Sequence, residues 1–218
     1  MDKIRSKLFF ASLGIPTPFY LPVHKSELKG NSISKISARI LDSLSVPMVV
    51  KPTKAGSAIG VEIIKRKDKV KPALAQGLME SDELIVEEYI EGPEVTVGII
   101  GNDDLQTLPI VEIVSENEFY DFEAKYDGKS RHIIPANIPK VVADKVNRYA
   151  LAAHVGLGCR NFSRVDFIIG REDHIPYILE INTIPGMTDV SLFPDAARVD
   201  GMEFPDLIEH LVQLALEE

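Results

Sequence analysis

Two short apolar segments in the second half of the chain carry polar residues at a spacing that could hold a cation. In Tyr177-Ile-Leu-Glu180-Ile-Asn182, the side chains of Glu180 and Asn182 are two residues apart, so in a strand they share a face. Arg164 and Asp166 have the same spacing in an upstream apolar segment. Carboxylate and carboxamide oxygens are ligands that suit a hard cation such as Mg²⁺.

The way in which these two segments pair decides whether they form one site. If they form an antiparallel hairpin that turns near Gly170, then Asp166, Glu180 and Asn182 converge on one metal–phosphate site, with the cation Arg164 beside it. A surface hairpin with alternating polar residues gives the same spacing and is the commoner origin of any single Glu-x-Asn. Because two charged strands would share one face here, the metal site is the better interpretation.

A second candidate is the glycine-punctuated loop from Thr53 to Gly60, which follows a strand ending near Lys51. Its small residues would let backbone N–H groups approach phosphate oxygens closely. The loop is too short for a Walker A motif, and a strand, not a helix, is predicted after it, which excludes a dinucleotide fingerprint. An ordinary hairpin turn explains this loop about as well.

Composition and charge limit the classes of function. The net charge of −9 argues against a nucleic-acid partner. No apolar run is long enough to span a bilayer and no signal-peptide pattern is present, so we expect no membrane partner. The single cysteine, Cys159, excludes an intrachain disulfide and is expected to be a buried thiol. The five histidines lack metal-ligand spacing, so zinc is not expected.

The elements that must position these residues are short strands interspersed with helices. Apolar periodicity predicts helices over 2–13, the second half of 25–45, 69–81, 140–155, 191–199 and 203–216. Strands are predicted over 19–23, 47–52, 61–64, 84–100 with a break at Gly92-Pro93, 108–114, and the two site segments. The aromatic and charged stretch 117–131 has no clean period and is either a functional lid or a surface loop. The pattern indicates an α+β fold with mostly antiparallel sheets.

Six distinctive motifs follow one another along nearly the whole chain. They are Met1-Asp-Lys3-Ile-Arg-Ser-Lys-Leu, Val50-Lys51-Pro-Thr-Lys-Ala-Gly56-Ser57, Glu87 with Gly92-Pro93-Glu94-Val-Thr-Val, Phe119-Tyr-Asp-Phe122-Glu-Ala-Lys125-Tyr126, Arg164-Val-Asp166, and Leu179-Glu180-Ile-Asn182-Thr-Ile-Pro-Gly186-Met-Thr. Each motif is moderately specific, but their ordered combination is highly specific. Together they resemble the D-alanine–D-alanine ligase family of ATP-grasp enzymes.

The resemblance implies an ATP-grasp fold in which two α+β subdomains clamp ATP. It divides the chain into a leading helix over 1–15, a smaller central subdomain over 16–100, and a C-terminal subdomain over 101–218 that holds the lid and the Mg²⁺ site.

The resemblance also implies a role for individual residues. The ATP-binding set is Lys3 and Lys51 on the phosphates, Gly56 and Ser57 in the loop over them, Glu87, Glu88 and Ile90 around the adenine, Glu94 on the ribose, and Lys125 on the γ-phosphate. The metal set is Asp166, Glu180 and Asn182, which would ligate two Mg²⁺ ions, replaceable by Mn²⁺. The catalytic and substrate set is Arg164 and Gly186 at the acyl centre, Ser57 and Tyr126 near the substrates, and Ser191 and Leu192 on the carboxylate of the second D-alanine.

The implied activity is ATP-dependent joining of two D-alanines through a D-alanyl phosphate for peptidoglycan precursors in the cytoplasm. The family carries a further N-terminal domain ahead of the position of Met1, and that domain supplies contacts to the first D-alanine. Expected partners are therefore ATP, D-alanine, a separately encoded N-terminal domain and, through apolar surface left exposed, a second copy of the chain. The alternative is a truncated module that binds Mg-ATP without turnover.

Overall fold

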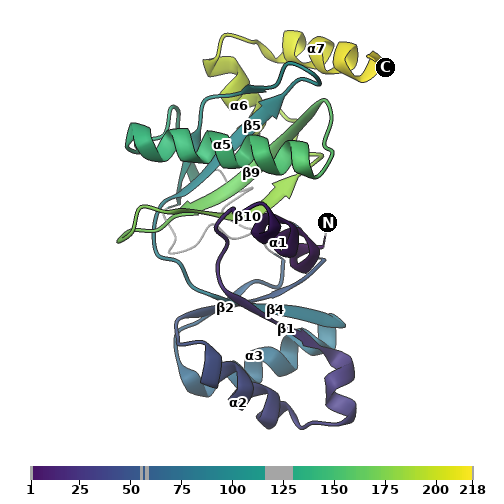
Figure 1. Ribbon diagram of the computed structural model, residues 1–218, viewed down its shortest axis with the longest axis vertical. Coiled ribbons are helices and arrows are strands. Elements are labelled where there is room, and N and C mark those ends of the chain that lie inside the picture. Colours follow the sequence, from purple (N-terminus) through teal and green to yellow (C-terminus); the bar gives the residue numbers. More distant parts are fainter. Residues whose placement is uncertain (1, 55, 57–58, 116–129, 218) are drawn as a thin grey trace. The chain divides into compact units, whose positions relative to one another are not determined.

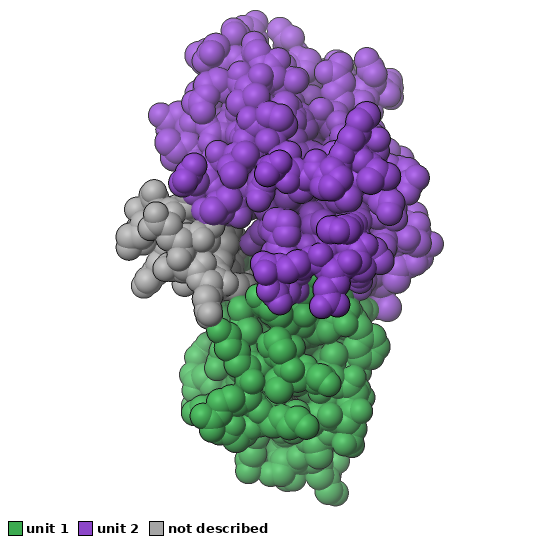
Figure 2. All heavy atoms as spheres, turned by 90° about the vertical axis from the view of Figure 1, so that its left-hand side faces the viewer, with its two compact units in different colours: residues 1–6, 18–90, 117–129 green, residues 7–17, 91–116, 130–218 purple. Residues whose placement is uncertain are grey.

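A computed structural model describes residues 2–54, 56, 59–115 and 130–217. Its described residues form two compact units, coloured separately in Figure 2. Unit 1 comprises residues 2–6 and the described part of 18–90, and unit 2 comprises residues 7–17, 91–115 and 130–217. Each unit has its own sheet and its own hydrophobic core.

Unit 1 is a four-stranded antiparallel sheet with helices packed on one face (Figure 1). The strand order is β1-β4-β2-β3, and the connecting segments are η1, α2 and α3. Alternating apolar residues of the strands meet the apolar stripe of α2, in which Ile36 and Ile40 are buried four residues apart. The bounds are β1 Tyr20–His24, η1 Lys25–Lys29, α2 Ile33–Ser43, β2 Met48–Pro52, β3 Glu62–Ile64, α3 Lys67–Glu80 and β4 Glu83–Glu88.

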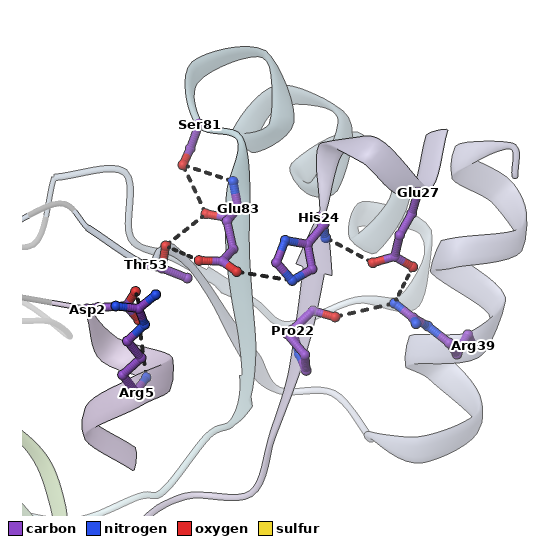
Figure 3. Close-up of polar contacts among 9 residues, drawn as sticks. All are labelled: Asp2, Arg5, Pro22, His24, Glu27, Arg39, Thr53, Ser81 and Glu83. Atoms are coloured by element: carbon purple, nitrogen blue, oxygen red, sulfur yellow. Dashed lines mark hydrogen bonds and ion pairs between the residues drawn. The ribbon is translucent and has the colours of Figure 1, made fainter. Parts of the chain in front are cut away.

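A polar network at one end of this sheet ties β1 and β4 to neighbouring segments (Figure 3). The carboxylate of Glu83 accepts a hydrogen bond from the buried hydroxyl of Thr53 at 2.9 Å and pairs with Nε2 of His24 at 3.1 Å. Glu27, at the start of η1, accepts from the backbone N–H of His24 and pairs with Arg39 of α2. These contacts fix the position of Thr53, which follows β2 directly.

Unit 2 is a larger antiparallel sheet with strand order β10-β9-β5-β7-β8, and β6 pairs with β5. Helix α5 covers one face, where it buries Val142, Val146, Ala150 and Ala153 against the sheet. The bounds are α1 Lys3–Ser12, β5 Glu94–Ile100, β6 Gln106–Thr107, β7 Val111–Ser115, β8 Ser130–Ile133, α5 Lys140–Gly156, β9 Phe162–Ile169, β10 Pro176–Asn182, α6 Leu192–Val199 and α7 Phe204–Leu216.

The two faces of β5 have different roles. Val95, Val97 and Ile99 belong to the core under α5. The alternate positions point to the opposite face. There, a Cβ at Gly98 would lie 2.9 Å from ring atoms of Phe193, so glycine at this position allows α6 to pack closely. This second face of the sheet is the one that carries the polar pairs of β9 and β10.

A β-bulge in β10 separates its core-facing residues from its site residues. Ile178 and Ile181 are both buried in the same core although they are three residues apart, which a regular strand does not allow. The register shifts between Ile178 and Glu180, so one extra residue is accommodated there. The bulge places Glu180 opposite Asp166 while Ile181 stays in the core.

The structure confirms the α+β class, and every strand pairing among the described residues is antiparallel. Most elements begin or end within two residues of the predicted bounds. Strand β8 lies at the end of a stretch predicted as lid or loop. Strand β5 belongs to the sheet of unit 2, whereas the sequence assigned residues 16–100 to the smaller subdomain. None of the described helices is both long and apolar enough to cross a membrane.

Candidate metal and nucleotide site

The strongest polar cluster of unit 2 surrounds Asp166 in the middle of β9. The hairpin predicted from the sequence is present, because β9 and β10 pair antiparallel across the turn that begins at Gly170. Its register places Glu180 opposite Asp166 and Asn182 opposite Arg164. On the other side of β9, Thr96 of β5 lies opposite Asp166. The cluster is therefore built from three adjacent strands.

Four donor groups of the described residues surround the carboxylate of Asp166, which is only 7% exposed. Arg164 donates from Nε to Oδ1 at 2.9 Å and from Nη2 to Oδ2 at 2.8 Å. Oδ1 also accepts from the hydroxyl of Thr96 at 2.5 Å, and Oδ2 accepts from Nδ2 of Asn182 at 2.9 Å. These bonds occupy the approximately four lone-pair positions of a carboxylate. They offset the cost of burying its charge.

The donor set of this cluster fits a hard divalent cation. Asp166, Glu180 and Asn182 supply carboxylate and carboxamide oxygens from neighbouring strands, and oxygen is the ligand that Mg²⁺ prefers. Among the described residues, no group of three or more His, Cys, Asp or Glu side chains is placed to hold a metal. A cation held here would meet two carboxylates and one carboxamide. Since the four lone-pair positions of Asp166 are occupied, ligation requires one donor to leave.

In unit 1, the corresponding feature is an ion pair between Lys51 of β2 and Glu87 of β4. Nζ of Lys51 lies 2.6 Å from Oε2 of Glu87, and the two side chains are 11% and 3% exposed. Burying a lysine and a carboxylate on adjacent strands costs free energy unless both charges have partners. Tyr20 lies opposite Glu87 in the β1–β4 pairing, and burial together with the charge of Glu87 raises the pKa of Tyr20.

The other predicted nucleotide residues of unit 1 have diverse positions. Lys3 begins α1, and its backbone N–H donates to the carbonyl of Thr53 at 3.0 Å. The carboxylate of Glu88 accepts from the backbone N–H of Phe19 at 2.7 Å, so the structure gives this side chain a role in joining β4 to the start of β1. Ile90 follows β4 and is half-buried. A Cβ at Gly56 would meet no atom within 4 Å.

In unit 2, the structure brings Gly186 and Ser191 together at the N-terminus of α6. A Cβ at Gly186 would lie 3.0 Å from Oγ of Ser191. That hydroxyl bonds to the backbone N–H and the hydroxyl of Thr188 and does not cap the helix. Leu192 is buried in the first turn of α6. Glu94 stands at the start of β5, two positions from Thr96 and on the same face.

Three predicted residues, Ser57, Lys125 and Tyr126, lie outside the described residues. Two polar features of the structure, Thr96 and the His132–Asp195 pair, had no role in the prediction from the sequence. Thr96 was predicted to lie in a strand but was given no role, although its two-residue spacing from Glu94 placed it on a face with another polar residue. His132 of β8 pairs with Asp195 of α6 at 2.6 Å, and Asp195 also pairs with Arg198. The local sequence contains no signal for that contact.

Several known proteins are similar to this chain. A family model described as "D-ala D-ala ligase C-terminus" matches residues 9–213. A D-alanine--D-alanine ligase of Carboxydothermus hydrogenoformans is 44% identical over 218 residues, which are all of this chain and 69% of that protein. The chain belongs to the D-alanine–D-alanine ligase family. The family predicted from the sequence motifs is thereby confirmed, and with it the enzyme class of ATP-dependent ligases.

Solved structures of the ligase family show the same ATP-grasp fold. A D-alanine--D-alanine ligase from Bacillus anthracis, complexed with ATP, superposes with a TM-score of 0.80 at 30% identity, covering 99% of this chain and 65% of that one. The VanG D-Ala:D-Ser ligase from Enterococcus faecalis gives a TM-score of 0.84 at 28% identity, covering 99% and 62%. The chain thus spans about two thirds of the length of these ligases.

Proposed function

We propose that this chain is the ATP-binding and catalytic part of a ligase that joins two D-alanines through a D-alanyl phosphate in peptidoglycan precursor synthesis. The observation that carries the proposal is the Asp166 cluster, in which oxygen ligands for a cation and the guanidinium of Arg164 meet on one sheet face of a ligase-family chain. No nucleophile–base pair on the protein is required, because the reacting groups belong to the substrates.

The reaction has two steps that balance without a protein nucleophile. A carboxylate oxygen of the first D-alanine attacks the γ-phosphate of ATP, which yields the acyl phosphate and ADP. The amine of the second D-alanine then attacks the acyl carbon and expels inorganic phosphate. Both steps concentrate negative charge on oxygens that are transferred or released, so the protein contributes positioning and electrostatic stabilisation.

We assign the ATP-binding residues from the resemblance to the ligase family. In unit 1, Lys3 and Lys51 would face phosphates, with the loop around Gly56 and Ser57 over them. Glu87, Glu88 and Ile90 would surround the adenine. The Lys51–Glu87 contact of 2.6 Å supports this assignment, because it holds the ammonium of Lys51 in a fixed, partly desolvated position. Glu94, in unit 2, would bind the ribose hydroxyls, and Lys125 would reach the γ-phosphate.

Asp166, Glu180 and Asn182 would hold two Mg²⁺ ions, or Mn²⁺ in their place. When bound, such ions neutralise phosphate charge and polarise the phosphoryl oxygens. Two hydrogen bonds to Asp166 fix the orientation of the Arg164 guanidinium, and with it the direction of its remaining N–H groups. We assign to Arg164 and the backbone of Gly186 the stabilisation of negative charge at the acyl centre.

The carboxylate of the second D-alanine is assigned to the N-terminus of α6, at Ser191 and Leu192. Backbone N–H groups at a helix N-terminus attract anions. The hydroxyl of Ser191 bonds to Thr188 and does not cap α6, so an anion could take the capping role. Tyr126 is assigned, with Ser57, to positioning the substrates and favouring D-alanine as the second one.

A second candidate function is a Mg-ATP-binding module without turnover on its own. The specific observation in its favour is that the chain spans about two thirds of the ligases it resembles, so contacts to the first D-alanine in those proteins can come from the remaining third. The partners proposed for such a module are a separate N-terminal domain, which would supply those contacts, and a second copy of the chain.

Phosphate release from this chain with Mg-ATP, with and without D-alanine, separates the two functions. D-alanine-stimulated release with dipeptide formation, detected by mass spectrometry, is the result expected for the ligase. ATP binding without stimulated release would favour the module. Glu180→Gln tests the metal assignment in the same assay, because it removes one charge from the assigned metal site. Wild-type-like Mg-ATP binding in that variant would refute the metal assignment.

A further inference from the structure

We propose that Thr96 is a positioning residue of the metal site, whose buried hydroxyl holds Asp166 in the orientation that binds the cation. The inference rests on the proposed function, because it takes Asp166 as a metal ligand. It adds a residue of β5 that lies within one of the family motifs but had no role assigned to it. Thr96 itself does not touch the metal and acts only through Asp166.

The contact between the two side chains is short and buried. Thr96 is 1% exposed, and its Oγ1 lies 2.5 Å from Oδ1 of Asp166, the shortest of the four donor distances around that carboxylate. The same hydroxyl lies 3.1 Å from the backbone carbonyl of Val165. A hydroxyl has one proton, and the shorter distance and the negative charge of Asp166 favour donation to the carboxylate.

Burial and strand geometry make Thr96 a fixed anchor. It lies in the middle of β5, which is paired with β9 on one side and β7 on the other, directly opposite Asp166. Its β-branched side chain restricts rotation about χ1, so the hydroxyl is held toward β9 before any ligand binds. An anchor of this kind reduces the conformational freedom that a metal would otherwise have to remove from Asp166.

Of the four donors around Asp166, the amide of Asn182 is the one that can yield to a cation. Thr96 and Arg164 lie in strands that are paired on both sides, whereas Asn182 is the last residue of the edge strand β10. Asn182 is also assigned to the metal through its carboxamide oxygen, so reorientation of its amide would open a lone pair on Oδ2. Thr96 and Arg164 would then keep holding Oδ1 while the metal binds.

Three substitutions test this role by direct metal binding. Thr96→Val keeps the branched shape and removes the hydroxyl, and Thr96→Ser keeps the hydroxyl. Thr53→Val is the matched control, because Thr53 is also 1% exposed and also donates to a carboxylate, that of Glu83, at 2.9 Å (Figure 3). The full chain is titrated with Mn²⁺ alone, and free Mn²⁺ is quantified by electron paramagnetic resonance. Thermal unfolding without metal establishes that each variant is folded.

We expect T96V to weaken Mn²⁺ binding by about 10- to 100-fold, the usual effect of losing a hydrogen-bond partner of a metal ligand. T96S should lie closer to wild type than to T96V, and T53V should bind Mn²⁺ like wild type. Unchanged or tighter binding by T96V, or an equal loss in T53V, would overturn the role of Thr96.

Asp166→Asn distinguishes this failure from failure of the metal assignment. If D166N weakens Mn²⁺ binding and T96V does not, the metal site stands and the inference about Thr96 is wrong. If D166N binds Mn²⁺ like wild type, or if the wild-type chain has no saturable site, the proposed metal site fails and this inference fails with it.

Discussion

His154 makes the stability of unit 2 depend on pH in a way that the structure allows us to quantify. Its side chain lies in α5, is 1% exposed, and bonds through Nδ1 to the hydroxyl of Ser163 on β9 at 2.8 Å. Nε2 is buried and has no hydrogen-bond partner among the described residues. Burial lowers the pKa of His154, and the backbone of Cys159 offsets part of this effect. The folded protein therefore favours the neutral imidazole.

The sign of the pH dependence follows from that lowered pKa. Below the ordinary pKa of about 6.5, the unfolded chain takes up a proton at His154 that the folded chain does not bind. The stabilising effect is therefore complete above pH 6.5 and is lost as the pH falls toward the folded-state pKa. Between pH 7.5 and 5.5, the free energy of unfolding falls by at most about 1.4 kcal/mol. This maximum is reached if only the unfolded chain takes up the proton.

Urea unfolding at pH 7.5, 6.5 and 5.5, monitored by far-UV circular dichroism, measures this effect. The comparison is with His154→Gln, which can still bond to Ser163 but does not titrate. The difference in unfolding free energy between wild type and H154Q should shift against wild type as the pH falls, by up to about 1.4 kcal/mol. Contributions from the other titrating groups cancel in this difference. A difference independent of pH would refute the reasoning.

Two further predictions concern a buried ion pair and a close backbone approach. Lys51→Met should destabilise unit 1 by about 3 kcal/mol, because Glu87 loses its 2.6 Å partner, and Lys51→Met combined with Glu87→Leu should recover most of it in urea denaturation. No recovery in the double variant would contradict this. Gly92→Ala places a Cβ on top of the carbonyl oxygen of Ile169, so it should cost more than Gly158→Ala. At Gly158, φ is +67° and an added Cβ would meet no atom within 4 Å. Only the left-handed backbone conformation therefore destabilises Gly158→Ala, by about 1–2 kcal/mol. Equal stability of the two alanine variants would refute the steric explanation.

The parts of the site that could be predicted from the sequence are the local ones. Arg164, Asp166, Glu180 and Asn182 lie on two strands joined by a short turn, so alternation along each strand was sufficient to place them on one face. The spacing of Ile178 and Ile181 even contained a signal of the bulge, because both are apolar yet three residues apart. That spacing was not interpreted as a bulge.

The parts that could not be predicted depend on pairing between distant strands. Gly92-Pro93 suggested a simple break between two strands, but β4 and β5 belong to different sheets. The contact of Thr96 with Asp166 requires the register of β5 against β9, which alternation within either strand does not determine. Likewise, the pairing of His132 with Asp195 depends on how α6 packs near β8. In each case tertiary packing, not local propensity, fixes the partner.

The arrangement of the Asp166 cluster has a consequence for the order in which the protein folds. Asn182 and Asp166 are 16 residues apart, whereas Thr96 and Asp166 are 70 residues apart. Closing the longer loop costs about 1.3 kcal/mol more in chain entropy. The β9–β10 hairpin can therefore form before its anchor arrives from β5. A partly unfolded chain would display the acidic hairpin without its buried hydroxyl, so cation affinity would report the pairing of β5 with β9.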